Sequence, residues 1–239
     1  MIPVAMDPDY HKLLHNHSRE GGPLTRHLLA KATEERVASI KREFKEAFEF
    51  ITKFQRSVTV FGSTRVLEDN PYYQKARKLA KRIAELDYTI VTGGGPGIME
   101  AANRGAFEAG RQSVGLNIKL PQKQPSNSFL TDQMDFHYFF TRKVALSFAA
   151  EAYIFFPGGY GTLDEFFEII TLVQTGKIRR VPIILVGVLY WSALGEFIRN
   201  KAFKEHRAIS EEDMKLFTIT DDEEEIIKIV KSTPVITHL

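Results

Sequence analysis

The chain has 239 residues, and its 32 lysines and arginines nearly balance its 30 aspartates and glutamates, giving a formal net charge of +2. That balance argues against nucleic acid or an anionic membrane as the main partner, because both favour a clear excess of basic residues. The absence of cysteine excludes disulfides, thiolate nucleophiles and zinc sites built on sulfur.

The amino-terminal part differs in pattern from the rest. Residues 1–56 begin with a polar, histidine-containing stretch, after which residues 34–54 carry apolar side chains at helical spacing. We therefore expect an N-terminal helical extension over residues 1–56, whose apolar face packs on the main domain or on another subunit. His11 and His15 have the spacing of a helical metal-binding pair, but no H-E-x-x-H arrangement is present, so no metal site is predicted.

From residue 57 onward, strand and helix patterns alternate. The patterns predict strands over 58–61, 88–91, 113–117, 135–139, 153–156 and 181–186, and helices over 72–86, 98–109, 142–150, 163–174, 191–200 and 221–231. This alternation predicts an α/β fold over residues 57–239: a Rossmann-like doubly wound parallel sheet with helices on both faces and a C-terminal helical tail. Ligands bind such sheets at the carboxyl ends of the strands.

Glycine-rich turns follow two of the predicted strands. Residues 92–97 read TGGGPG and residues 157–162 read PGGYGT, and each turn leads into a predicted helix. The first N–H groups of a helix lack internal partners and carry the positive end of the helix dipole, so each turn is suited to hold a phosphate. Neither a G-x-G-x-x-G fingerprint nor a Walker A sequence is present, so a mononucleotide fits better than a dinucleotide or an ATPase.

Charged and hydroxyl side chains near these turns have both structural and functional interpretations. Glu165 lies three residues after Thr162, which is the spacing of a capping box as well as of a site acid. Arg142 and Lys143 open a predicted helix, where the dipole disfavours cations and a bound anion would offset the cost. Ser63 follows the first strand and either donates a hydrogen bond to the nucleotide or forms a turn.

Residues 157–165, PGGYGTLDE, match the P-G-G-x-G-T-x-x-E signature of the LONELY GUY (LOG) family, whose members were formerly called lysine decarboxylases. Arg142-Lys143 matches the R-K of the family's other motif, and the resemblance extends over about residues 57–187. The resemblance implies a homo-oligomeric phosphoribohydrolase without a cofactor. Such an enzyme hydrolyses the N-glycosidic bond of nucleoside 5'-monophosphates, either AMP or cytokinin riboside monophosphates, to free base and ribose 5-phosphate.

The resemblance also implies roles for particular residues. Arg142 and Glu165 would carry catalysis. Independently of the resemblance, we expect Met99 to line the base pocket and Ser63 to contact the nucleotide. The residues implied to hold the nucleotide are Gly94, Gly95, Lys143, Gly158, Gly159, Gly161 and Thr162. Asp164 stands where the family often has glutamate, which keeps the charge but shortens its reach.

Two other functions are weighed beside the hydrolase. A decarboxylase would need a lysine that forms a Schiff base with pyridoxal phosphate, and Lys143 is the only lysine near the predicted anion site. A non-catalytic carrier of a nucleotide or of the molybdenum cofactor would use the same fold without reacting on its ligand. A cytoplasmic location is expected because no signal-peptide core and no apolar stretch of about 20 residues is present.

Overall fold

The computed structural model describes residues 26–119 and 126–234, and for residues 26–32 only the helical backbone. Contacts divide the chain into a first unit, residues 1–46, and a compact second unit, residues 47–239. Helix α2 (Arg26–Ile51) runs from the first unit into the second and begins earlier than the pattern predicted. Ala47 and Ile51, at its end, belong to the hydrophobic core of the second unit. The His11–His15 pair lies outside the described residues.

A single seven-stranded sheet forms the centre of the second unit. Its strands are β1 (Ser57–Phe61), β2 (Thr89–Thr92), β3 (Ser113–Ile118), β4 (Asp132–Phe136), β5 (Ala152–Phe155), β6 (Ile183–Leu185) and β7 (Thr218–Ile219). They lie in the order β4-β3-β2-β1-β5-β6-β7, and every pair is parallel. The order reverses direction between β1 and β5, so the loops that follow these two strands diverge and leave a crevice between them.

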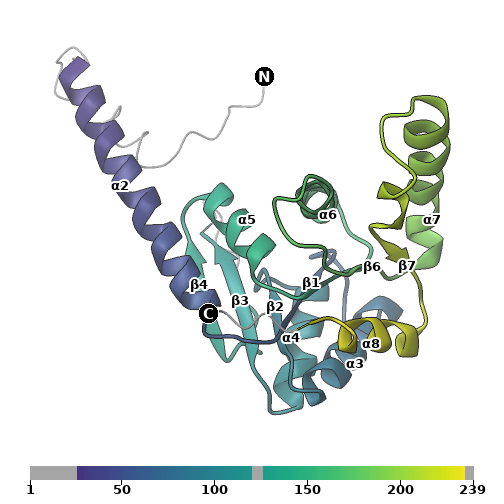
Figure 1. The fold of residues 1–239 in the computed structure, drawn as a ribbon. Helices are drawn as coiled ribbons and strands as arrows, with labels where there is room; N and C mark the ends of the chain where they lie inside the picture. Colours follow the sequence, from purple (N-terminus) through teal and green to yellow (C-terminus); the bar gives the residue numbers. More distant parts are fainter. Residues whose placement is uncertain (1–25, 120–125, 235–239) are drawn as a thin grey trace. The chain divides into compact units, whose positions relative to one another are not determined.

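Helices cover both faces of this sheet, as Figure 1 shows for the second unit. The helices are α3 (Pro71–Glu85), α4 (Ile98–Glu108), α5 (Phe139–Phe148), α6 (Tyr160–Gln174), α7 (Val188–Phe197) and α8 (Glu223–Lys231), with a π-helix at Ile198–Glu205 and a 3-10 turn at Asp213–Lys215. Alternate strand residues enter different cores: Val60 and Ile154 pack with α3, α4 and α8, whereas Phe61 and Phe155 pack with α5 and α6. The predicted doubly wound α/β fold is confirmed.

The element boundaries differ from the prediction in one place that matters for the site. The fourth strand is Asp132–Phe136 and not 135–139, and α5 begins at Phe139, three residues before Arg142. The aromatic run at residues 136–140 satisfies strand and helix patterns equally, so periodicity alone could not place the boundary. The π-helix after α7 was likewise not foreseen.

Candidate active site at the carboxyl ends of β1, β2 and β5

A cleft of about 830 Å³ opens at the carboxyl ends of β1, β2 and β5. Three loops and the facing ends of α5 and α6 form its walls. The lining residues are Phe61, Gly62, Ser63, Thr64, Arg65, Val66, Gly93, Met99, Phe139, Arg142, Leu146, Pro157, Gly158, Gly159, Tyr160, Gly161, Thr162, Asp164 and Glu165. Eight of the predicted site residues therefore line this one cleft: Ser63, Met99, Arg142, Gly158, Gly159, Gly161, Thr162 and Glu165.

Backbone hydrogen bonds at Ser63 join the three loops. The Ser63 N–H donates to the Pro157 carbonyl at 3.0 Å, and the Ser63 carbonyl accepts from the Ile98 N–H at 3.0 Å. Gly97 permits this approach, since a Cβ there would lie 2.3 Å from the Ser63 oxygen and the residue has φ of 72°. The loop after β1 is thus fixed between the PGGYG loop and the start of α4.

The PGGYG loop leads directly into α6, which begins at Tyr160 with Gly159 as its N-cap and no side-chain cap. The first N–H groups of a helix have no intrahelical acceptor, so this end of α6 presents donors to an anion in the cleft. The capping-box interpretation is wrong. Thr162 lies inside the first turn, and Glu165 is a buried helical residue that makes no return bond to an N-cap.

Glu165 is one of two carboxylates that line the cleft, the other being that of Asp164. Glu165 is only 8% exposed, and its Oε2 has no hydrogen-bond partner among the described residues. Burial raises the pKa of this carboxyl to about 7; Lys143 and Arg142 lower it, while Glu168 and Asp164 raise it further. A buried oxygen without a partner is costly, so its presence indicates a group held ready for a ligand.

Lys143 lies behind this carboxylate and does not line the cleft. Its Nζ is 2.5 Å from Asp164 Oδ2, 2.7 Å from Glu168 Oε2 and 3.9 Å from Glu165 Oε1. Burial lowers the pKa of Lys143, but the hydrogen bonds to Asp164 and Glu168 outweigh it and raise the value overall. A lysine held in its charged form is unsuited to form a Schiff base, which needs the neutral amine.

Arg142 projects from α5 toward the end of β3. Its Nε donates to the Leu116 carbonyl at 2.7 Å, and its Nη2 would lie 2.2 Å from a Cβ at position 93. Gly93 therefore leaves the space that the guanidinium occupies. Burial lowers the pKa of Arg142, and Glu165 raises it. The expectation that Arg142 and Lys143 open a helix is wrong, because α5 begins at Phe139. The two cations follow the first three residues of the helix, so the unfavourable effect of its dipole on them is weaker than expected.

Gly94 and Gly95 do not line the cleft. The Gly94 carbonyl accepts from the Asn127 N–H at 2.9 Å, and the Gly95 carbonyl accepts from Asn127 Nδ2 at 3.1 Å. Gly94 has φ of 70°, and a Cβ there would meet the Asn117 side chain. These two glycines shape the loop, while their neighbours Gly93 and Met99 reach the cleft.

Several lining residues were not predicted. Gly93 was hidden among three consecutive glycines, and Phe139 and Leu146 were missed because the start of α5 was misplaced. Tyr160 occupies the variable position of the PGGYGT motif and is 93% exposed. Arg65 belongs to the GSTR sequence after β1, and a cation directly after a buried strand at the carboxyl edge was the signal available for it.

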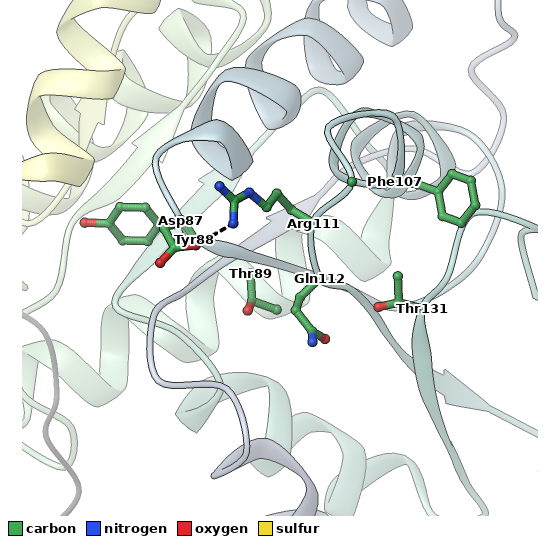
Figure 2. Close-up of a pocket in the computed structure, with 8 residues that line it drawn as sticks. Asp87, Tyr88, Thr89, Phe107, Arg111, Gln112 and Thr131 are labelled. Atoms are coloured by element: carbon green, nitrogen blue, oxygen red, sulfur yellow. Dashed lines mark hydrogen bonds and ion pairs between the residues drawn. The ribbon is translucent and has the colours of Figure 1, made fainter.

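A second cavity of about 530 Å³ lies at the other edge of the sheet, near the amino ends of β2 and β3. Figure 2 shows its residues, among them Asp87 and Arg111, whose Oδ1 and Nη1 are 2.9 Å apart. None of the predicted site residues lines it, and its charged pair is mutually satisfied. The cleft at the carboxyl ends is therefore the candidate active site.

Metal and membrane features were also sought. Within residues 33–119 and 126–234, no group of three or more histidine, aspartate or glutamate side chains is arranged to hold a metal ion. No helix in the described ranges combines the length and the apolar character that crossing a membrane requires.

The parallel sheet and its cleft at the reversal of strand order define a Rossmann-like α/β protein. The sequence profile described as "Possible lysine decarboxylase" matches residues 99–230, which is more than half of the chain. The chain therefore belongs to this family, the LOG family.

Named relatives agree with this assignment. Cytokinin riboside 5'-monophosphate phosphoribohydrolase LOG7 of Arabidopsis thaliana is 33% identical over 161 residues, which cover 64% of this chain and 71% of the relative. The enzyme of the same activity named LOG, from Oryza sativa subsp. japonica, is 30% identical over 139 residues, 57% of each chain.

Solved structures share the fold. The molybdenum cofactor carrier protein of Chlamydomonas reinhardtii superposes with a TM-score of 0.55 at 21% identity, over 74% of this chain and 96% of that one. The molybdenum cofactor binding protein of Rippkaea orientalis has a TM-score of 0.52 at 20% identity, over 74% and 94%. At these identities the likeness concerns the fold alone.

Proposed function

We propose that this protein hydrolyses the N-glycosidic bond of nucleoside 5'-monophosphates, AMP or a cytokinin riboside monophosphate, to free base and ribose 5-phosphate. The observation that carries the proposal is the buried Glu165 carboxylate with an unpartnered oxygen, at the wall of a cleft that also presents Arg142 and the start of α6. Relatives named for this reaction support it at the level of the family.

The proposed mechanism begins with the 5'-phosphate at the start of α6, where the PGGYG loop leaves backbone donors unobstructed. This position directs the ribose toward Glu165. As the bond from C1' to the base lengthens, positive charge develops on the sugar, as in glycoside hydrolysis. Ionised Glu165 stabilises that charge and orients a ribose hydroxyl or the attacking water. Water gives its hydroxyl to C1', and the departing base nitrogen gains a proton, with Arg142 positioned to favour departure.

The base would face the apolar part of the cleft, where Met99, Phe139 and Leu146 contribute side chains. Apolar contacts discriminate poorly between bases, since one methylene or hydroxyl changes specificity only modestly. We therefore leave the preferred base to the experiment. Homo-oligomerisation is part of the proposal and is supported by the partly exposed aromatic side chains Phe148 on α5 and Phe167 on α6.

The test is incubation with a panel of purine, pyrimidine and cytokinin riboside monophosphates, followed by chromatography. We expect free base and ribose 5-phosphate in equal amounts from at least one member. Saturable binding of a monophosphate without base release would contradict hydrolysis and would identify the non-catalytic carrier instead.

Gly93→Ala offers a test of how Arg142 is held. The new methyl group would displace the guanidinium, the flexible end of a long side chain, so we expect a loss of turnover of about tenfold or more with little change in Tm. Gly97→Ala is the contrasting variant. Its Cβ would collide with the Ser63 backbone at positive φ, which costs about 1–3 kcal/mol or more of folding stability. Activity assays and thermal melts of both variants check the expectation; a Gly93→Ala protein with normal turnover would contradict it.

A further inference from the structure

The charged side chains of α5 and α6 do not supply enough positive charge to neutralise a bound phosphate. On the side of the cleft formed by α5 and α6, two cations of α5, Arg142 and Lys143, interact with three carboxylates of α6. These carboxylates are those of Asp164, Glu165 and Glu168. A nucleoside monophosphate carries about two negative charges near neutral pH. This wall alone therefore offers no surplus of positive charge to such a ligand.

Both cations of that wall are also engaged. The Lys143 ammonium contacts Asp164 and Glu168, and the Arg142 Nε donates to the Leu116 carbonyl. A phosphate could recruit Lys143 only by competing with its two carboxylates. Since charge-assisted hydrogen bonds inside a protein are among the stronger ones, such competition would be costly. The Leu116 bond, by contrast, occupies only one of the five N–H donors of Arg142, so Arg142 is the one cation that the described residues of this wall offer to a ligand.

Arg65 is different. It lines the cleft from the loop after β1, its side chain is exposed, and in the part of the chain that the structure describes no ion pair engages its guanidinium. Its backbone is nevertheless fixed, because the Arg65 N–H donates to Ser63 Oγ at 3.1 Å and the Ser63 N–H donates to the Pro157 carbonyl. An anchored backbone thus carries a free cation beside the PGGYG loop.

We propose that Arg65 is a substrate-binding residue that binds the 5'-phosphoryl group from the loop after β1. This inference rests on the proposed function and specifies how its substrate is held. The planar guanidinium can donate two parallel hydrogen bonds to phosphate oxygens, while the first N–H groups of α6 donate further ones. Arg65 touches no reacting atom, so its contribution lies in affinity for phosphorylated ligands.

The experiment compares Arg65→Ala and Arg65→Lys with Arg65 itself by calorimetric titration with AMP, ribose 5-phosphate and adenosine. All proteins titrated carry Glu165→Gln, so that AMP is not hydrolysed during the titration. Arg199→Ala, an exposed arginine in the π-helix, is the matched control. We expect Arg65→Ala to bind AMP and ribose 5-phosphate about tenfold to a hundredfold more weakly, which corresponds to loss of a charged hydrogen-bond pair. Affinity for adenosine should stay within about twofold, and Arg65→Lys should recover part of the loss because it restores the charge but not the planar fork.

Unchanged affinity of Arg65→Ala for AMP would overturn the inference, and so would an equal loss for AMP and adenosine. Failure of the proposed function gives a different result: the unaltered protein would bind AMP without releasing adenine, while the Arg65 comparison still decides the binding role. If the enzyme is active, kcat of Arg65→Ala at saturating AMP should remain within about threefold of the unaltered value, with the change confined to KM.

Discussion

Glu165→Gln should lower the rate of base release by about a hundredfold to ten-thousandfold while leaving the fold intact. The amide occupies nearly the same volume as the carboxylate but cannot stabilise developing positive charge on the sugar. Glu196→Gln, an exposed position on α7, is the matched control and should retain full activity. Chromatographic assay of base release from AMP measures both. Normal turnover in Glu165→Gln would show that the catalytic carboxylate has been misassigned.

The same residue predicts the pH dependence of the unaltered enzyme. Burial is the main reason that the pKa of Glu165 is raised to about 7, against the opposing charges of Lys143 and Arg142 and with the support of Glu168 and Asp164. Because the ionised form is the active one, kcat/KM should fall tenfold per pH unit below about 7 and level off above it. Glu168→Gln removes a carboxylate that raises this pKa, so the acid limb should move to lower pH. An acid limb caused only by the substrate phosphate would not move.

Stability should change in the opposite sense to activity. The pKa of Glu165 in the folded state is higher than the usual value of 4.5, so the folded state binds this proton more tightly than the unfolded chain does. Folding stability is then greatest below the usual pKa and is lost as pH rises toward about 7, by an amount on the order of 3 kcal/mol. Glu165→Gln removes that loss. We expect its Tm to exceed that of the unaltered protein at pH 8, with the difference shrinking toward pH 5.

Arg142→Ala is the second substitution for which a large loss is expected, about a hundredfold to a thousandfold in kcat. The guanidinium is partly buried, donates to the Leu116 carbonyl, occupies the space left by Gly93 and interacts electrostatically with Glu165. Arg142→Lys should not restore activity, because an ammonium lacks the Nε–H and the planar shape that this space fits. Removing the cation should also raise the pKa of Glu165, so the acid limb of any residual activity should move to higher pH.

Arg111→Ala is the matched control for Arg142, because Arg111 lines the second cavity at the amino ends of the strands. Its removal should leave turnover unchanged. Loss of activity in Arg111→Ala together with normal activity in Arg142→Ala would contradict the assignment and would indicate that the reaction takes place in the second cavity. Either result can be obtained with AMP and a single chromatographic assay.

The sequence sufficed for the fold because strand and helix periods alternate clearly from residue 57 onward, and the two glycine turns marked the carboxyl edge of the sheet. Motif and charge also selected Arg142 and Glu165, which both line the cleft, while their catalytic roles stay predictions. The sequence could not show which charged side chains pair with one another in the folded protein. Lys143 stands beside Arg142 in sequence, yet one position along a helix rotates a side chain by about 100°, so it faces the carboxylates of α6 and not the cleft.

Spatial neighbours distant in sequence account for the other differences. Gly94 and Gly95 look like a phosphate loop in the sequence, but the Gly94 N–H donates to Thr92 Oγ1 at 2.9 Å, and Asn127, more than 30 residues downstream, donates to both glycine carbonyls. Thr162 and Glu165 have capping-box spacing, but α6 begins at Tyr160, so the N-cap is Gly159 and Thr162 lies inside the helix. Local spacing cannot reveal either competing arrangement.

The hydrogen bonds that meet at the Ser63 backbone affect the thermodynamics of binding. Because the loops after β1 and β5 and the start of α4 are already joined there, a ligand does not have to order them, and little backbone entropy is lost when it enters. The entropic cost falls instead on long side chains such as that of Arg65. We therefore expect a ligand to bind this cleft with little backbone rearrangement, so that adaptation is confined to side chains at its rim.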